Sequence, residues 1–290
     1  FEVLLKNINT VGKNNPQYKE SPQSELMSAY VYNTSLPLIR NTEKNRNTLE
    51  PKLSFRFSPH DMKNNSAQKR RMSIKNIYSA DRLGMGDSFE SGESLTMGLN
   101  FKQERVKIKD EIKKISDFLD FKLATVLRLN EEKNIPINST LKKKQSNLFG
   151  HLKLRPNNHV SLNYDFSVTD NLDMIEYNSI IANFNYKNFN TSFNILEERG
   201  VVGVTNVIQN STSYTFDKSN SIKFNTRKNR NLNLTEYYDL VYQYQNDCLI
   251  AGIQYKKNYY NDADIKPVDE LFFTITIVPL TTFSPDKLLK

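Results

Sequence analysis

Apolar and polar side chains alternate along short stretches in the second half of the chain. The clearest stretch has Val160, Leu162, Tyr164, Phe166 and Val168 at its apolar positions, with Ser161, Asn163, Asp165 and Ser167 between them. Successive side chains of a β-strand point to opposite faces of the sheet, so this period of two predicts one apolar face and one polar face. Lipid suits the first face and water suits the second, which is typical of a membrane-spanning β-strand.

The same alternation predicts a series of such strands. From residue 147 onward we expect strands at 147–155, 159–168, 177–186, 189–197, 206–216, 221–229, 234–244, 248–259 and 269–279. Each is close to the roughly 9–11 residues that a tilted spanning strand needs. The first half is less regular, and we expect strands there at 25–34, 51–59, 92–104 and 117–129. In the last of these, Leu119, Phe121, Leu123, Leu127 and Leu129 share one face.

The connections between the expected strands alternate in length. Short turns with Asn or Asp are expected at 156–158, 187–188, 217–220 and 245–247, and longer connections at 169–176, 198–205 and 260–268. Short periplasmic turns that alternate with longer outer loops are typical of an outer-membrane β-barrel. By this alternation we expect Cys248 and the C-terminus on the periplasmic side.

Two segments of the first half interrupt the pattern. Residues 60–91 are too many and too polar for a simple turn, which predicts an outer loop that folds over the barrel or into its lumen. The segment from Val106 to Ser116 is rich in charge and weakly helical in pattern. We expect it to form a solvated loop or a short helix.

Composition is consistent with a barrel and excludes a bundle of membrane helices. Hydrophobic residues make up 38% of the chain and the mean hydropathy is −0.62, with no run near the ~20 apolar residues that a spanning helix needs. A barrel strand requires only alternate apolar residues. The length of 290 residues allows one large domain, two smaller ones or a piece of something larger. Because the sequence opens at Phe1 without a signal-like segment, we expect a piece of a larger protein.

The net charge of +8 has three interpretations. Basic residues gather mainly in connections, as at 69–71, 142–144 and 228–230. Solvated loop charge explains this distribution best, and contact with anionic lipid phosphates comes second. Nucleic acid is not expected as a partner, because no recognition helix or nucleic-acid-binding strand accompanies the charge. The tyrosines cluster in the last strands, which fits either a membrane interface or ordinary strand propensity.

Catalysis has little support in the sequence. The three histidines, His60, His151 and His159, belong to no metal-binding spacing and to no nucleophile elbow. The acidic pairs at 131–132 and 197–198 fall in or beside expected loops, where solvation explains them. We therefore expect no enzymatic activity, no cofactor and no metal site.

Three segments of the chain have distinctive residues in a fixed order. The first has Asp81 and Arg82 followed by Gly84, Gly86 and Asp87, and then a strand. The second is the strand bracketed by Pro51 and Pro59, and the third opens the penultimate strand with Cys248 and Leu249. In their order and spacing these segments resemble the LptD family of outer-membrane lipopolysaccharide-assembly proteins, and the resemblance extends over nearly the whole chain.

The resemblance implies an all-β fold, an antiparallel transmembrane β-barrel of about two dozen strands. Residues 1–290 would be its C-terminal portion of about 13–14 strands, and the N-terminal periplasmic jellyroll and the early strands would be missing. The last strand would form a lateral seam, with Leu271, Phe273, Ile275 and Ile277 on one face. The residues expected to face the lumen are Asn163, Asp165, Asn183, Asn194, Thr274 and Thr276.

The implied function is insertion of lipopolysaccharide into the outer leaflet of the outer membrane through the lumen and the seam. Implied partners are lipopolysaccharide, outer-membrane lipid, an LptE-like lipoprotein plug and, through the missing N-terminal domain, an LptA-like periplasmic bridge protein. Cys248 would form a disulfide to the missing N-terminal region. Without the resemblance, Cys248 is equally well explained as a small apolar residue beside Leu249.

Two other classes of protein share the alternation. A porin or receptor barrel for solute passage usually ends its last strand at a terminal aromatic residue, whereas this chain continues past Pro279. A soluble β-sandwich would bury its Leu and Phe faces against a second sheet, and partition into detergent separates it from a barrel.

Overall fold

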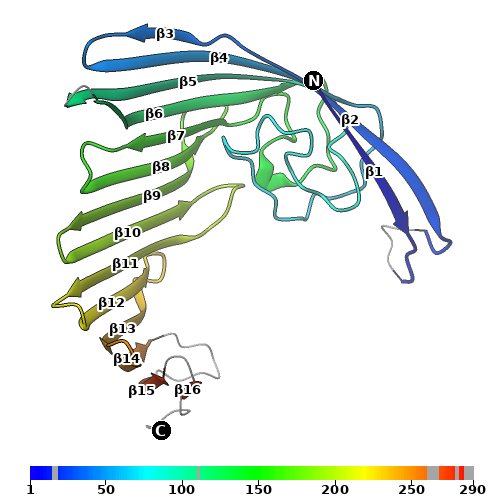
Figure 1. Cartoon of the computed structure of the whole chain (residues 1–290). Helices are drawn as coiled ribbons and strands as arrows, with labels where there is room; N and C mark the ends of the chain where they lie inside the picture. Colours follow the sequence, from blue (N-terminus) through cyan, green and yellow to red (C-terminus); the bar gives the residue numbers. More distant parts are fainter. Residues whose placement is uncertain (15–18, 110–111, 260–267, 278–280, 284–290) are drawn as a thin grey trace. The chain divides into compact units, whose positions relative to one another are not determined.

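The computed structural model describes residues 1–14, 19–109, 112–259, 268–277 and 281–283. The alternating residues form a 16-stranded sheet in which neighbouring strands of the ladder are consecutive along the chain, except that β3 pairs only with β4 (Figure 1). The strands are β1 (Glu2–Thr10), β2 (Gln23–Ser35), β3 (Leu38–Asn41), β4 (Asn45–Ser58), β5 (Gly92–Lys109), β6 (Ile112–Arg128), β7 (Leu148–Leu154), β8 (Val160–Val168), β9 (Ile175–Tyr186), β10 (Phe189–Glu198), β11 (Asn206–Thr215), β12 (Asn220–Asn229), β13 (Leu234–Gln245), β14 (Leu249–Asn258), β15 (Val268–Ile277) and β16 (Thr281–Phe283).

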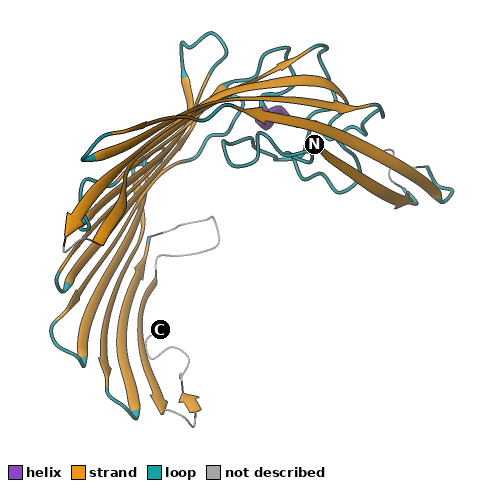
Figure 2. Cartoon of the chain, turned by 45° about the horizontal axis from the view of Figure 1, so that its top comes forward, coloured by secondary structure: helices purple, strands orange, loops and turns teal. Residues whose placement is uncertain are grey.

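The predicted all-β, antiparallel class is confirmed, and Figure 2 shows the strands with the connections at their ends. A single 3₁₀ turn, η1 (Ile137–Ser139), interrupts the β structure of the described residues. In that same part of the chain, no helix is long and apolar enough to cross a membrane. The strands predicted from residue 147 onward agree with β7 to β15 to within two residues at each described end, because alternation is strongest there.

The prediction for Val106 to Ser116 is wrong. This segment continues β5 and opens β6, with Val106 paired to Ile115 across the hairpin. The local charge suggested a loop, but the two strands pair residue by residue through the whole segment, from Glu104 opposite Asp117 to Lys109 opposite Ile112. A register shift between Gln103 and Glu104 brings these positions opposite each other. β5 and β6, with 18 and 17 residues, are longer than the roughly 9–11 residues that cross a membrane, so their charged ends can lie in water.

Three strands were not predicted, which accounts for the difference between 16 strands and the expected 13–14. They are β1, the short β3 and the short β16. Because β16 pairs with β15, with Ile275 opposite Phe283, the strand expected to be last is followed by another. Pro279 and the connection at 260–267 lie outside the described residues.

Contacts divide the chain into two compact units. Unit 1 comprises Phe1–Leu154, Tyr164–Asn178 and Glu198–Val204, and unit 2 comprises Arg155–Asn163, Ser179–Glu197 and Thr205–Lys290. Unit 1 therefore holds β1 to β7 together with the long connections at 59–91 and 129–147. Unit 2 holds β11 to β16 and most of β10.

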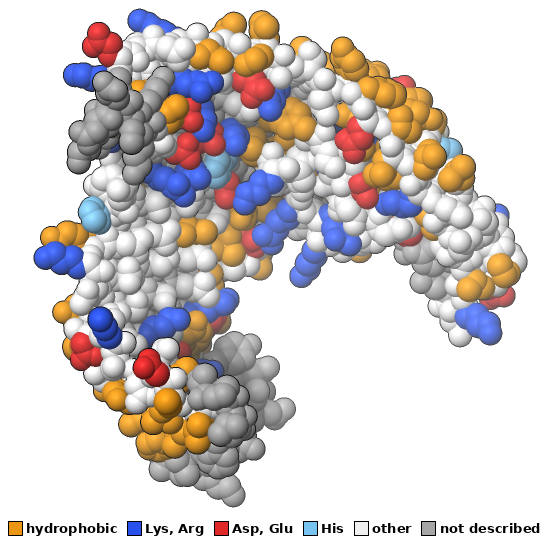
Figure 3. Space-filling model, viewed as in Figure 1, with side chains coloured by type: hydrophobic (Ala, Val, Ile, Leu, Met, Phe, Trp, Pro, Cys, Tyr) orange, Lys and Arg blue, Asp and Glu red, His pale blue; other side chains and the backbone are white. Residues whose placement is uncertain are grey.

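In unit 1 the two faces of the sheet differ sharply. On the apolar face, Leu99 pairs with Leu123 and Phe55 with Leu95, and such side chains remain exposed in the chain by itself. Figure 3 shows exposed hydrophobic side chains gathered on the surface of the strands near the N-terminus. On the opposite face, Ser54, Ser58 and Thr96 are buried beneath the connections. In each unit we call the polar face of the sheet the inner face.

Unit 2 shows the same difference between its two faces. One cross-strand row is apolar and contains Phe224, Leu240, Tyr255 and Leu271. The adjacent row on the inner face is polar and contains Ser211, Asn225, Asp239 and Lys256. Alternation in the sequence therefore becomes rows of like side chains in the sheet, because neighbouring strands pair in register.

Candidate functional site

The connection 59–91 folds onto the inner face of unit 1 and forms two small hydrophobic cores with it. Met72, Ile77 and Met85 pack with Ala124 and Val126 of β6 in the first core, to which the connection 129–147 also contributes. In the second, Ala80 and Phe89 pack against Ile8, Met27, Ala29 and Val31 of β1 and β2. Apolar residues of the strands therefore pack against the connection beside the buried polar residues of the inner face. The connection 59–91, which the sequence predicts to be an outer loop, packs against the sheet in both cores.

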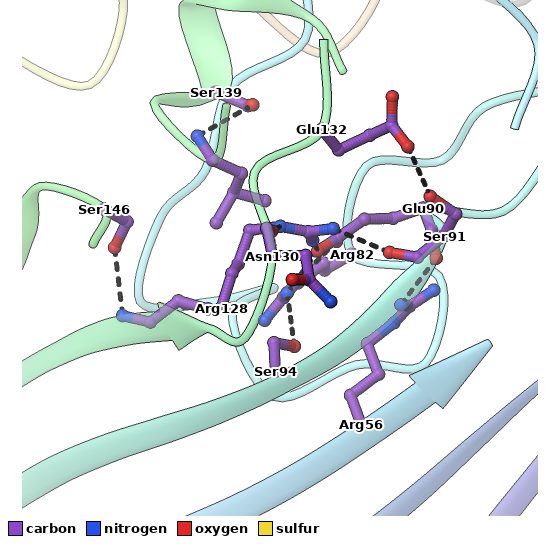
Figure 4. A network of polar contacts seen from close by, with 12 residues as sticks. Arg56, Arg82, Glu90, Ser91, Ser94, Arg128, Asn130, Glu132, Ser139 and Ser146 are labelled. Carbon is purple, nitrogen blue, oxygen red and sulfur yellow. Dashed lines mark hydrogen bonds and ion pairs between the residues drawn. The ribbon is translucent and has the colours of Figure 1, made fainter. Parts of the chain in front are cut away.

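A buried carboxylate at the end of this connection organises a network of three arginines (Figure 4). Glu90 accepts two hydrogen bonds from Arg82, from Nε at 2.7 Å and from Nη2 at 2.6 Å. Arg128, at the end of β6, also pairs with the Glu90 carboxylate. The side chains of Arg82, Glu90 and Arg128 are at most 2% exposed. Fork-like pairing of this kind is the strongest that arginine makes with a carboxylate.

The sheet presents the other partners of this network in one register row. Arg56 of β4, Ser94 of β5 and Arg128 of β6 lie opposite one another. Arg56 donates hydrogen bonds to the backbone oxygens of Ala80, at 2.9 Å, and Glu90, at 2.7 Å. Arg82 donates to the Ser94 hydroxyl at 2.9 Å. The network therefore joins the connection to three neighbouring strands, and we call it the Glu90 network.

Electrostatics favour the ionised form of Glu90. Burial alone would raise the pKa of its carboxyl group, but the positive charges of Arg82, Arg56 and Arg128 outweigh burial and lower that pKa to about 2. Since the folded pKa lies below the ordinary value of 4.5, the stabilisation is fully present above pH 4.5 and is lost as the pH falls toward 2.

This linkage gives a testable pH dependence. We expect the full-length protein in a planar bilayer to keep a low ionic conductance down to pH 4.5 and to conduct more as the pH falls toward 2, because protonated Glu90 no longer holds the connection. A Glu90→Gln variant should show no step in that pH range. A conductance step of equal size in this variant would show that another group is responsible.

The loop from Asp81 to Asp87 is held in place by its charged residues. Asp81 accepts a hydrogen bond from Lys6 of β1 at 3.1 Å, and Arg82 belongs to the Glu90 network. Asp87 accepts from the Asn65 amide at 3.2 Å. Gly84 has a φ of +58°, which favours a residue without a Cβ, whereas Gly86 has open space around it. The motif therefore combines a turn with charged residues that hold the turn against the strands.

Sequence reasoning located this loop but missed most of the Glu90 network. Arg56, Glu90 and Arg128 are isolated charged residues in the sequence, 34 to 38 positions apart where they meet. A signal existed for Arg56, which occupies a polar position of a strand whose other side is apolar. No signal marked Glu90.

The longer connections of unit 1 also hold one another. The Asn138 amide donates to the backbone oxygens of Val201, at 2.8 Å, and Val202, at 3.0 Å. Arg71 forms an ion pair with Glu198, whose side chain is 2% exposed. These contacts link the connections 59–91 and 129–147 to the end of β10 and to the connection that follows it.

The residues expected to face the lumen lie on the inner face. Asp165 pairs with His151 at 2.6 Å, the Asn183 amide donates to the Ser161 hydroxyl at 3.3 Å, and the Asn194 amide donates to Gln209 at 3.4 Å. Asn163 shares the face of Asp165, two residues away on β8. Thr274 and Thr276 are half-buried and alternate with exposed apolar residues of β15. Their facing a lumen stays a prediction.

Unit 2 carries an open polar cavity of about 530 Å³ on this face. Its lining includes Asn194, Asn225 and Asp239. Asn225 donates to Asp239 at 3.1 Å and accepts from the Ser211 hydroxyl at 2.7 Å, and Gln254 donates to Asp239 at 2.7 Å. Hydroxyl, amide and carboxylate groups thus form a continuous row that can exchange hydrogen bonds with water or sugars.

The predicted seam residues share the apolar side of β15. Phe273, Ile275 and Ile277 are 36–46% exposed and Leu271 is half-buried. Cys248, in the turn before β14, has an exposed free thiol. Within the described residues, no group of three His, Cys, Asp or Glu side chains could hold a metal ion.

An antiparallel sheet with one apolar face, one polar face and a folded connection fastened to the polar face is the architecture of a membrane β-barrel protein. Within that class, the family model described as LptD: LPS transport system D matches residues 6–245. The chain belongs to this family and is therefore a component of lipopolysaccharide transport. Cys248, β14 and β15 lie outside the matched residues.

Among solved structures, the chain is similar to a triple mutant of the Rh. blastica porin, with 8% identity, 95% of this chain and 90% of that chain covered, and a TM-score of 0.38. It is also similar to a double mutant of the Rh. blastica porin, with 8% identity, 98% and 97% coverage, and a TM-score of 0.33. A search of curated proteins gave no match.

Proposed function

We propose that the chain is part of an outer-membrane translocon that inserts lipopolysaccharide into the outer leaflet through a barrel lumen and a lateral seam. The observation that carries this proposal is the family match over residues 6–245, which contains both the two-faced sheet and the Glu90 network. Lipopolysaccharide is amphipathic, and its transport calls for a polar route beside an apolar exit.

The inner face supplies the polar route in this proposal. Sugar hydroxyls would exchange hydrogen bonds with the row that contains Ser211, Asn225 and Asp239, where water otherwise does so. Acyl chains would leave sideways between the first and last strands of the complete barrel, past the apolar side of β15. The protein moves its substrate without bond chemistry, so we propose no enzymatic activity and no cofactor.

The covering connection would keep the lumen closed to small solutes in unit 1. Its two hydrophobic cores and the Glu90 network fasten it to six strands, β1, β2, β4, β5, β6 and β7. Partners implied by the family are an LptE-like lipoprotein within the lumen and an LptA-like bridge protein at the periplasmic domain.

Depletion of the full-length protein from its host tests the proposal. We expect lipopolysaccharide exposed on the cell surface to fall while lipopolysaccharide accumulates inside the cell. The row of polar groups in unit 2 would also suit a barrel for small hydrophilic solutes, which is the alternative function. Normal surface lipopolysaccharide with altered uptake of small solutes would contradict transport and support that alternative.

Cys248 gives a separate prediction for the full-length protein. Its exposed thiol lies in the turn before β14, and we propose that it pairs with a cysteine of the N-terminal periplasmic domain that the family implies. We expect Cys248 to be alkylated readily in residues 1–290 alone and to be protected by a disulfide in the full-length protein. Non-reducing mass spectrometry of both proteins measures this, and an alkylated Cys248 in the full-length protein would refute the disulfide.

A further inference from the structure

Unit 1 contains a second feature on its inner face, a cavity of about 290 Å³ between β4 to β7 and the connection 59–91. Its polar lining consists of Lys52, Lys75, Tyr78, Asn100, Lys122 and His151. The lining therefore contains three ammonium groups and no carboxylate. None of these residues belongs to the Glu90 network.

The strands present this lining in register. Asn100 of β5 lies opposite Lys122 of β6, and Lys122 lies opposite His151 of β7. Lys52 of β4 lies opposite Gly98, one row closer to the Glu90 network. Paired strands hold these groups at fixed spacing, so the wall of the cavity is preformed rather than assembled from flexible loops.

The connection closes the cavity with Tyr78 and Lys75. Gly98 makes room for Tyr78, since a Cβ at this position would lie 1.9 Å from the tyrosine hydroxyl. That hydroxyl is buried and has no hydrogen-bond partner among the residues that the structure describes. Burial, together with the charge of Glu50, raises the pKa of Tyr78 to about 12, so the hydroxyl remains a donor at physiological pH. A buried donor without a partner is costly, and a ligand oxygen would satisfy it.

Two of the three lysines of the lining are held in ion pairs, and the third forms none with the described residues. Lys52 pairs with Glu50 at 3.3 Å and Lys122 with Asp120 at 3.2 Å, both neighbours on the same strand. The Lys75 ammonium forms no ion pair with a carboxylate of the described residues, and Asp165 nearby is engaged by His151. Unlike Lys52 and Lys122, Lys75 is exposed and is not held in a salt bridge by the described residues, although its charge also acts on Asp165.

We propose that this cavity binds a phosphoryl group, carried on a sugar or as free phosphate. Ammonium groups and a neutral hydroxyl donor match the acceptor-only oxygens of a phosphomonoester. The phosphoryl group would contact both the strands and the connection, and so would strengthen the hold of the connection on the inner face. The assignment to a phosphorylated sugar rests on the proposed transport function, whereas phosphate binding itself does not.

Calorimetric titration of the purified full-length protein in detergent at low ionic strength tests this. The probes are glucose 1-phosphate, inorganic phosphate and glucose. We expect both phosphates to bind and glucose not to bind, and Lys122→Gln to weaken binding about tenfold. Lys143→Gln is the matched control, because Lys143 pairs with Asp170 in a connection and does not line the cavity.

Tyr78→Phe separates a binding role from a structural one. Removing an unpartnered hydroxyl should leave folding unchanged, judged by heat-modifiable electrophoretic mobility, yet weaken phosphate binding about five- to tenfold. Tighter binding of glucose 1-phosphate than of inorganic phosphate assigns the site to a phosphorylated sugar, and equal binding assigns it to the free ion. Unchanged phosphate binding in folded Tyr78→Phe and Lys122→Gln, or equal binding of glucose, overturns the proposal.

The two proposals fail in different measurements. If phosphate does not bind but depletion lowers surface lipopolysaccharide as expected, the phosphate site is refuted and the transport function stands. Normal surface lipopolysaccharide on depletion, with phosphate binding that depends on Tyr78, would remove the transport function and leave the site.

Discussion

Replacement of Glu90 by glutamine is expected to release the connection 59–91 from the strands and make the outer membrane leaky. The variant leaves Arg56, Arg82 and Arg128 buried without a balancing carboxylate. Removing one partner of a buried ion pair typically costs about 3–5 kcal/mol, because the remaining charges stay desolvated. This cost is comparable to the stability that a folded connection can contribute, so the open form should become populated.

Two readouts follow from this release. Arg82 is 1% exposed, so trypsin should cleave after it only when the connection has left the inner face. Intact cells that carry Glu90→Gln should yield a tryptic fragment ending at Arg82 and should admit a large antibiotic that the outer membrane normally excludes.

Glu131→Gln is the matched control, since Glu131 is exposed in a connection of the same unit. Glu90→Asp should have an intermediate effect, because it keeps the charge and shortens the reach. Cleavage after Arg82 at the wild-type rate in Glu90→Gln would contradict the role given to this carboxylate.

The second large effect is expected on the apolar face. Leu99 lies near the middle of β5, paired with Pro51 and Leu123 on a face that we assign to lipid. Leu99→Arg should lower the free energy of unfolding in lipid by about 2–4 kcal/mol if the residue lies at the bilayer midplane, and by less nearer an interface. Guanidinium unfolding of the full-length protein in lipid vesicles measures this.

Leu232→Arg provides the matched control for this substitution. Leu232 is 66% exposed and lies in the connection between β12 and β13, where arginine remains in water. We expect little change there. A bimane label on Leu99→Cys should also be quenched by brominated lipid, whereas equal stability of the two arginine variants and no quenching would contradict the lipid-facing assignment.

The sequence carried most of the fold because the barrel pattern is local. Alternation within ten residues is sufficient to identify a strand such as β8, and pairing between consecutive strands then follows from short connections. The hairpin tip around Val106 was misread because charge, rather than periodicity, dominated its interpretation. The short strands β3 and β16 contain too few residues to show a period.

The candidate site was harder to predict because its contacts are not local. The sequence pointed to the loop of Asp81 and Arg82, but not to Glu90, two of whose arginine partners come from the ends of strands. The same holds for Tyr78, whose position over Gly98 depends on the fold of the connection. Contacts between residues far apart in the sequence require knowledge of register and of how a long connection packs, and neither follows from periodicity.

Time-resolved photocrosslinking would show whether lipopolysaccharide passes along the inner face. A photoreactive side chain at Asn194 would face the proposed route, and one at Phe193, which is 47% exposed on the other face, would face outer-leaflet lipid. We expect pulse-labelled lipopolysaccharide to crosslink first at position 194. During the chase, this adduct should decline while the adduct at position 193 increases. No adduct of new lipopolysaccharide at 194, with normal delivery to the cell surface, would contradict a route along the inner face.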